Sequence, residues 1–194
     1  MKDIVINALS KRFGEQQVLR DFSAVFPAGE TVCIMGPSGC GKTTLLNILL
    51  GFESPDAGTV AGIPARISVV FQEDRLCEEF SALANIHLVT GKTVPDADIL
   101  DCLRELGLSE DPGKVVGAYS GGMKRRVAIA RALLSEGELL IMDEPFKGLD
   151  EGTREIVAAS IRRRTRGKTV IMVTHDPEEA RMMQASVMEM RKIV

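Results

Sequence analysis

The sequence predicts an α/β fold built on a parallel β-sheet that helices cover on both faces. Two observations carry this prediction: short, continuous apolar runs recur along the chain, and segments with helical spacing separate them. A strand that is buried on both faces is apolar at every position rather than at every second one. Strands that alternate with helices pair in parallel, because each helix returns the chain to the same end of the sheet.

The elements follow from these patterns in chain order. Two extended pieces, near residues 2–7 and 18–26, flank the turn-prone Phe13-Gly14-Glu15. Buried strands are predicted at residues 31–35, 67–71, 139–142 and 169–173. Helices are predicted at residues 42–50, 97–106, 120–134 and 151–164, and Asp96 is expected to cap the second of them. The remainder of residues 76–118 is mostly helical, with breaks at Gly91, Pro95 and Pro112.

Size and composition narrow the class of protein. The 194 residues, 45% of them hydrophobic, suit one domain with a substantial core. The net charge of −3 lacks the excess of basic residues that is typical of nucleic-acid binding, so no nucleic-acid partner is expected. No apolar run approaches the roughly 18 residues that cross a bilayer, and the N-terminus has no secretory apolar region, so a cytoplasmic protein is expected. The four cysteines form no CxxC pair, which leaves zinc and thioredoxin-type sites unsupported.

A glycine-rich loop follows the first buried strand. Its sequence, Gly36-Pro37-Ser38-Gly39-Cys40-Gly41-Lys42-Thr43, matches G-x-x-x-x-G-K-[ST] and is followed by Thr44. The glycines let backbone N–H groups surround a phosphate, and the helix that begins near Lys42 directs its positive end at it. Lys42 adds a charge at the β- and γ-phosphate oxygens, and Thr43 offers a hydroxyl to Mg²⁺. The loop predicts nucleoside triphosphate binding but not the reaction, because kinases, GTPases and motors share it.

Two carboxylates, Asp143 and Glu144, follow the apolar strand at residues 139–142 directly. This places them at the carboxyl edge of the sheet, where open α/β folds bind ligands. Asp143 is therefore expected to hold the Mg²⁺ shell, and Glu144 to polarise a water for in-line attack. The alternative, taken without the phosphate loop, is a strand followed by an acidic helix cap.

A second anion site is predicted at residues 119–132, Tyr-Ser-Gly-Gly-Met-Lys-Arg-Arg-Val-Ala-Ile-Ala-Arg-Ala. A hydroxyl and bare N–H groups at a helix start attract phosphate. Two such sites far apart in one chain suggest ATP clamped between two copies. The stretch resembles the signature of ATP-binding cassette (ABC) ATPases.

The elements around this stretch resemble the same family, in the same order. Gln72 is similar to the Q-loop glutamine, and Gly148-Leu149-Asp150 to the D-loop. His175 is similar to the switch histidine, and Phe13 to the aromatic that stacks on adenine, although each alone is more typical of a structural residue. The resemblance implies a RecA-like P-loop NTPase core with an N-terminal antiparallel β subdomain and an inserted α-helical subdomain. It also implies one domain over residues 1–194, with the core at about 1–75 and 125–194 and the helical subdomain at about 76–124.

The resemblance also implies a role for each matching residue. The implied catalytic residues are Glu144, His175 and Gln72. The implied nucleotide contacts are Phe13, Gly36, Pro37, Ser38, Gly39, Cys40, Gly41, Lys42, Thr43, Thr44, Ser120, Gly121, Gly122 and Asp150. The implied Mg²⁺ ligands are Thr43, Gln72 and Asp143.

Some positions depart from the family pattern. Tyr119 stands where leucine is usual, Met123 where glutamine is usual, and Lys147-Gly148 where Ser-Ala is common. The Ser-Gly-Gly-Met form and residues 71–76 look like the nitrate, sulfonate and taurine branch of bacterial importers. This implies an ATPase that powers import of a small solute from the inner face of the cell membrane. The implied partners are transmembrane permease subunits, a second ATPase subunit paired head to tail, and a solute-binding protein.

Two other functions remain open on these residues. A non-transport ABC ATPase, such as one of the iron–sulfur-assembly type, shares the same motifs. A small-molecule P-loop kinase would leave Ser-Gly-Gly at residues 120–122 unexplained. The basic run at residues 162–168 is typical of the C-terminal end of a helix. Cys40 is either a small filler of the loop or an oxidation-sensitive position.

Overall fold

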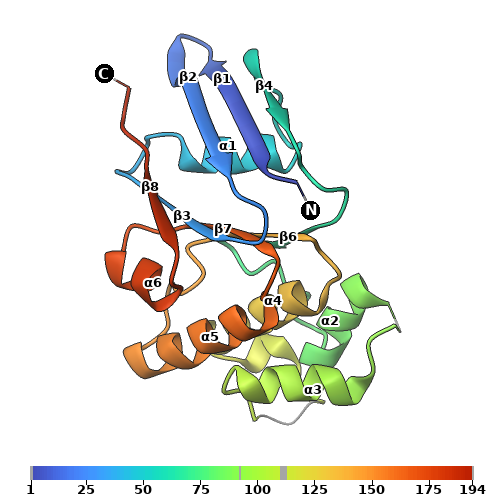
Figure 1. Cartoon of the computed structure of the whole chain (residues 1–194). Coiled ribbons are helices and arrows are strands. Elements are labelled where there is room, and N and C mark those ends of the chain that lie inside the picture. The colour runs from blue at the N-terminus through green and yellow to red at the C-terminus, as the bar shows by residue number, and fades with distance from the viewer. Residues whose placement is uncertain (1, 92, 110–112, 194) are drawn as a thin grey trace.

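The computed structural model describes residues 2–91, 93–109 and 113–193 and is centred on a five-stranded parallel sheet (Figure 1). The strand order is β5-β6-β7-β3-β8, and each pair of neighbours runs in parallel. The strands are β3 (Thr31–Met35), β5 (Ile67–Val70), β6 (Leu139–Asp143), β7 (Thr169–Val173) and β8 (Ser186–Glu189). The predicted parallel sheet is confirmed, and β8 is an edge strand that the apolar pattern did not predict.

A second, antiparallel sheet has the order β2-β1-β4. Its strands are β1 (Ile4–Phe13), β2 (Gln16–Phe26) and β4 (Ala57–Ala61). The first two form a long hairpin that turns at Gly14, whose positive φ of 59° suits glycine. Figure 1 shows helix α1 (Lys42–Leu49) between this sheet and the parallel sheet. This confirms the antiparallel subdomain that the family resemblance implied.

The parallel sheet separates two hydrophobic cores, and alternate residues of the central strands β3, β6 and β7 enter different cores. In β7, Val170 and Met172 pack with the helices of the C-terminal part, whereas Ile171 and Val173 pack with α1 and the antiparallel sheet. Every position of such a strand is buried. The double burial explains why the strand sequences are apolar throughout instead of alternating.

Helices close the other face of the parallel sheet. They are α2 (Ala82–Thr90), α3 (Asp96–Glu105), α4 (Gly121–Leu134), α5 (Glu151–Arg164) and α6 (Pro177–Met182), with a short 3₁₀ helix at Val116–Ala118. The prediction that Asp96 caps α3 is wrong by one residue, because Pro95 holds the cap position and Asp96 begins the helix. Proline suits the start of a helix because its backbone is extended there, and because the N–H group that proline lacks has no partner inside the helix at that position. Across the described ranges, no helix has the length and apolarity that a membrane span requires.

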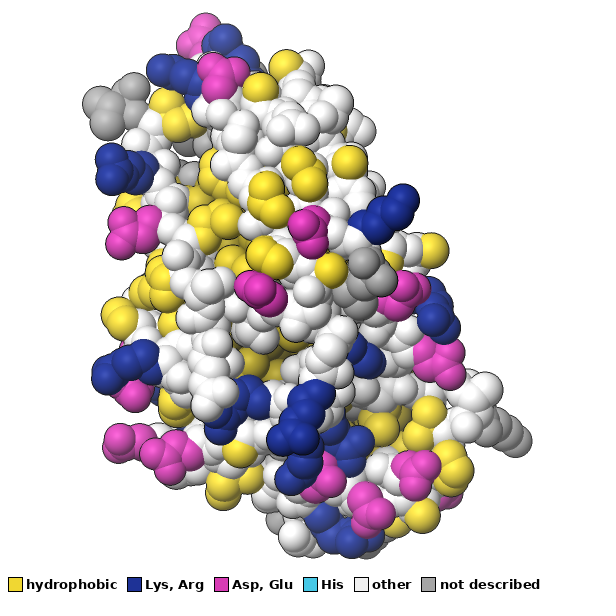
Figure 2. All heavy atoms as spheres, in the orientation of Figure 1, with side chains coloured by type: hydrophobic (Ala, Val, Ile, Leu, Met, Phe, Trp, Pro, Cys, Tyr) yellow, Lys and Arg dark blue, Asp and Glu magenta, His cyan; other side chains and the backbone are white. Residues whose placement is uncertain are grey.

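The packing of α2 and α3 against α4 forms the inserted helical part. The limits expected for this part, about residues 76–124, stay a prediction. Helix α4 crosses the upper limit, since it runs without a break from Gly121 to Leu134. The basic run ends α5 as expected, with arginines in the last helical turn. Arg163 Nη2 and Arg164 Nε lie 2.8 and 2.6 Å from the same oxygen of Glu105 and so join α5 to α3. Figure 2 shows Lys and Arg side chains gathered at this end of α5.

Candidate functional site

A pocket of about 850 Å³ opens at the edge of the parallel sheet where β3, β6 and β7 end. Open α/β sheets bind their ligands at this edge. The loop after β3 contributes Gly36, Pro37, Ser38, Gly39, Gly41, Lys42, Thr43 and Thr44. The other predicted residues in its wall are Gln72, Asp143, Glu144 and His175. Residues that the sequence singled out in four separate motifs therefore share one pocket.

The glycine-rich loop has the backbone shape that its glycines permit. Gly39 and Gly41 have φ angles of 77° and 100°, in the left-handed region. A Cβ at Gly41 would lie 3.0 Å from the backbone oxygen of Val18, and the positive φ there is itself strained for any other residue, so glycine suits this position against β2. Lys42 begins α1, and its Nζ donates hydrogen bonds to the carbonyls of Gly36 (2.6 Å) and Pro37 (3.0 Å). The ammonium and the positive helix end thus both lie at the loop, an arrangement that favours negative charge there.

The acidic strand end lies opposite this loop. Asp143 is the last residue of β6 and is half-buried. Burial and the neighbouring Glu144 raise the pKa of Asp143, and the charges of Arg125 and Lys42 act against them. Glu144 has a left-handed φ of 49°, which is unusual outside glycine and typical of functional sites. Its N–H donates to the carbonyl of Val173 (2.9 Å), which ties the end of β6 to β7.

His175 lies directly beside Glu144. The His175 Nδ1 atom is 3.0 Å from Glu144 Oε1, and 80% of the histidine side chain is exposed. The hydrogen bond with Glu144 and its charge raise the pKa of His175 above the ordinary value. The protonated imidazole is therefore the form that the carboxylate favours.

We expect the titration of His175 to depend on Glu144. The ion pair is complete below the raised pKa and is lost as the pH rises through it, because the neutral ring no longer attracts the carboxylate. Imidazole proton NMR against pH measures this, with a His175→Gln variant to assign the signal. Glu144→Gln should shift the titration of His175 to lower pH, and an unchanged midpoint would contradict the contact.

Further residues complete the wall, and the sequence did not predict them. Glu179 on α6 is buried, and Thr174 donates its hydroxyl proton to it. Arg154 on α5 has Nη1 3.2 Å from Asp176 and 3.7 Å from Glu179. Gln16 and Val18 also line the pocket. Lys147 and Gly148, which the D-loop resemblance had already singled out, line it as well. In the sequence, Glu179 is marked only as a carboxylate four positions after His175.

Six of the predicted nucleotide contacts do not line this pocket. These are Phe13, Cys40, Ser120, Gly121, Gly122 and Asp150. Cys40 is buried against the second core, with its Sγ 3.8 Å from Lys42 Nζ. Phe13 is 46% exposed at the end of β1, so it is not a residue of the hydrophobic core.

The Ser-Gly-Gly stretch starts α4 on the outside of the molecule. Ser120 is the exposed N-cap of α4, and its hydroxyl accepts a hydrogen bond from the N–H of Met123 (3.3 Å). Asp150 caps α5 in the same way and accepts from Thr153. A Cβ at Gly122 would lie 3.3 Å from Leu149, so the two caps are neighbours in space.

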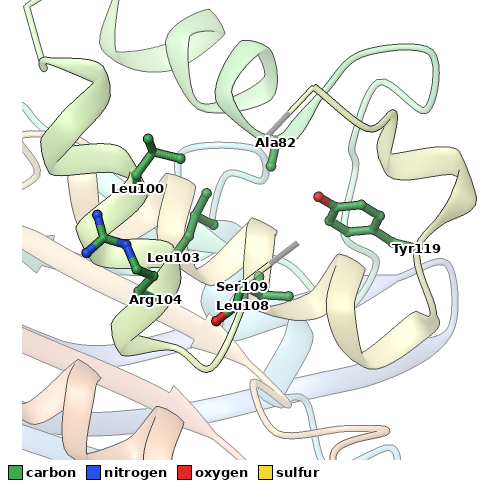
Figure 3. A pocket seen from close by; sticks show the side chains of 7 residues that line it. All are labelled: Ala82, Leu100, Leu103, Arg104, Leu108, Ser109 and Tyr119. Atoms are coloured by element: carbon green, nitrogen blue, oxygen red, sulfur yellow. The ribbon is translucent and has the colours of Figure 1, made fainter. Parts of the chain in front are cut away.

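Tyr119, just before this cap, points into a different pocket (Figure 3). That pocket has a volume of about 250 Å³ and lies among α2, α3 and the segment before α4. Its lining is mainly apolar and consists of Ala82, Leu100, Leu103, Arg104, Leu108, Ser109 and Tyr119. The tyrosine that replaces the usual leucine thus packs within the helical part and leaves Ser120 exposed.

Comparison with known proteins gives the following relatives. The chain is 41% identical over 185 residues to the aliphatic sulfonates import ATP-binding protein SsuB of Rhodopseudomonas palustris, which covers 90% of this chain and 66% of that protein. It is 39% identical over 199 residues to the taurine import ATP-binding protein TauB of Roseobacter denitrificans, covering 93% and 74%. The chain thus spans slightly less than two thirds of the length of the SsuB protein.

Solved structures and a family model also match the chain. The dimeric structure of MJ0796, a bacterial ABC transporter cassette, is 30% identical and superposes with a TM-score of 0.84 over 97% of this chain and 94% of that one. A bacterial Atm1-family ABC exporter with ATP bound, 22% identical with a TM-score of 0.85 over 100% of this chain and 38% of that one, shares the fold. The family model described as ABC transporter matches residues 19–147. The match to the family model, the shared cassette fold and the four motifs that meet in one pocket show that the chain belongs to the ATP-binding cassette (ABC) transporter family.

Proposed function

We propose that this chain binds and hydrolyses ATP and thereby powers a membrane transporter that imports a small solute. The observation that carries the proposal is the single pocket that holds Lys42 of the phosphate loop, Asp143 and Glu144 of the acidic strand end, Gln72 and His175. A triphosphate needs positive charge on its oxygens and a base for water, and this wall supplies both.

The phosphates would bind on residues 36–44, with the ammonium of Lys42 at the β- and γ-phosphate oxygens. Three oxygen donors of the wall, the Thr43 hydroxyl, the Gln72 amide and the Asp143 carboxylate, suit Mg²⁺. They would hold it together with the phosphates, and Mg²⁺ would neutralise charge on the transferred phosphoryl group. Within residues 2–91, 93–109 and 113–193, no group of three or more His, Cys, Asp and Glu side chains is placed to hold a metal ion.

Hydrolysis would use Glu144 as the general base. Its carboxylate accepts a proton from water as the water oxygen attacks the γ-phosphorus, and the bond to the bridging oxygen of ADP breaks. His175, which shares a hydrogen bond with Glu144, would contact the γ-phosphate and fix the orientation of the carboxylate. Gln72 would complete the shell around the water. These assignments are testable residue by residue.

The contacts outside the pocket point to a second copy of the chain. Ser120, Gly121 and Gly122 form a helix start on the surface, so they would contact ATP bound to the partner in a head-to-tail dimer. Asp150 lies next to this helix start and would help to connect the two sites. Phe13, exposed at the end of β1, would stack on adenine. Dimer closure would be the work stroke, and hydrolysis would reset it.

The named relatives support an importer of sulfonate-type solutes. The partners would be transmembrane permease subunits at the cytoplasmic face of the cell membrane, with a solute-binding protein in the assembled system. Exposed apolar residues on and beside α2, namely Phe80, Leu88, Val89 and Val115, offer a contact surface for such a permease. Figure 2 shows hydrophobic side chains on the surface in the region of α2.

Affinity purification from native membranes tests the transport role. The tagged chain would be isolated after detergent solubilisation, and its partners identified. A multi-spanning permease in stoichiometric amount is the expected result, and its own solute-binding protein would then identify the cargo. Recovery with soluble partners alone would contradict transport and favour a non-transport ABC ATPase.

A further inference from the structure

Arg125 is a buried charge on the helix that begins at Ser120. It lies in the second turn of α4, and its side chain is only 3% exposed. Removing a guanidinium from water is costly unless all of its donors find acceptors. An apolar side chain could fill the same space without this cost. The hydrogen bonds that Arg125 makes should therefore show why an arginine occupies the position.

The contacts of Arg125 reach two separate loops. Nε donates to the carbonyl of Pro145 (3.0 Å), and Nη2 donates to the carbonyls of Asp143 (2.7 Å) and Glu144 (2.6 Å). On the other side, Nη1 donates to the carbonyl of Phe71 (2.5 Å) and to Asp74 Oδ1 (3.1 Å). One planar group therefore joins residues 71–74 to residues 143–145.

The joined peptides carry the side chains of the pocket. Gln72 belongs to the first loop, and Asp143 and Glu144 belong to the second. The bond to the Glu144 carbonyl also fixes the peptide that follows Glu144, whose left-handed conformation costs free energy outside glycine. Because a guanidinium is rigid, one loop cannot shift without moving the other or breaking these bonds.

We propose that Arg125 is a positioning residue that keeps Gln72 and Glu144 in a fixed relation to each other and to the helix that begins at Ser120. The consequence for turnover rests on the proposed ATPase function. Nucleotide held by the glycine-rich loop would still bind without Arg125, but water and base would be misaligned. A displacement of about 1 Å at a reacting centre can lower a rate by about 100-fold.

A matched control is available on the same helix. Arg131 is also partly buried on α4, and it donates to the carbonyls of Asp74 and Arg75, both at 2.8 Å. No contact of Arg131 to residues 143–145 is present among the described residues. Arg131→Gln therefore removes an arginine that anchors only the first loop.

The first measurement needs no turnover. Hydrogen–deuterium exchange on the nucleotide-free chain should show faster exchange at residues 71–74 and 143–147 together in Arg125→Gln, but only near the first loop in Arg131→Gln. Arg125→Lys keeps the charge and serves if the glutamine variant does not fold. Because one ammonium cannot reach both loops, it should loosen at least one of them. Unchanged exchange at residues 143–147 in Arg125→Gln would overturn the proposal. If only Arg125→Lys folds, unchanged exchange at both loops in that variant would overturn it.

The second measurement is steady-state ATP hydrolysis. For Arg125→Gln we expect kcat to fall about 10- to 100-fold while the Kd for ATP changes less than about threefold. Arg125→Lys should recover part of kcat, and Arg131→Gln should retain most of it. Equal kcat in wild type and Arg125→Gln would overturn the positioning role. A wild-type chain that does not hydrolyse ATP would instead contradict the proposed function, and the exchange result would still decide the role of Arg125.

Discussion

Replacing Glu144 by glutamine is expected to abolish ATP turnover while leaving ATP binding intact. Glutamine keeps the size of the side chain and a hydrogen bond to His175, but it cannot accept the proton of the attacking water. A general base contributes about 10²- to 10⁴-fold to a rate, so kcat should fall by that factor. Phosphate release under steady-state conditions measures the loss.

The same variant should accumulate as a dimer when ATP is present, because a closed dimer that cannot hydrolyse ATP cannot reopen by that route. Size-exclusion chromatography with and without ATP tests this. Glu138→Gln is the matched control, since Glu138 is a half-buried carboxylate at the opposite end of β6, paired with Arg66. Wild-type turnover in Glu144→Gln would show that Glu144 is not the base.

Replacing Lys42 by alanine is expected to weaken ATP binding strongly. The ammonium lies inside the glycine-rich loop, held by the carbonyls of Gly36 and Pro37, where it can meet phosphate oxygens. A hydrogen bond to a charged group contributes about 1.5–3 kcal/mol, which corresponds to about a 10- to 150-fold change in Kd. Isothermal titration with ATP and Mg²⁺ measures the change.

The control for this variant is Lys168→Ala. Lys168 precedes β7, at the edge of the parallel sheet opposite to the pocket, so its charge is far from the phosphates. The two variants lose the same charge and differ only in place. Equal ATP affinity in both would contradict the placement of phosphate on the loop.

Local sequence patterns predicted the central strands because every position of such a strand is buried and therefore apolar. Strand β7 is buried throughout, and its apolar sequence followed directly. Strands β4 and β8 have mostly exposed residues and lie at sheet edges, so they left no such pattern. The short helix α6 was missed for a related reason, since six residues carry little periodicity.

The residues of the candidate site also fall into those that the sequence could predict and those that it could not. Motifs made of consecutive residues, such as the loop at 36–43, could be recognised because all of the groups that would bind phosphate lie next to one another in the sequence. Arg154, Glu179 and Arg125 could not, because each works through partners that the fold brings close: Arg125, for example, contacts residues more than fifty positions earlier and about twenty later.

The sequence by itself therefore determined the family, the parallel sheet and most of the pocket wall, since periodic burial and short phosphate-binding motifs are local properties. Only the tertiary structure decided that Glu144 pairs with His175, that Cys40 faces the core, and that Arg125 joins two loops of the site. These are contacts between segments far apart in the chain, and their geometry depends on packing that no local pattern contains.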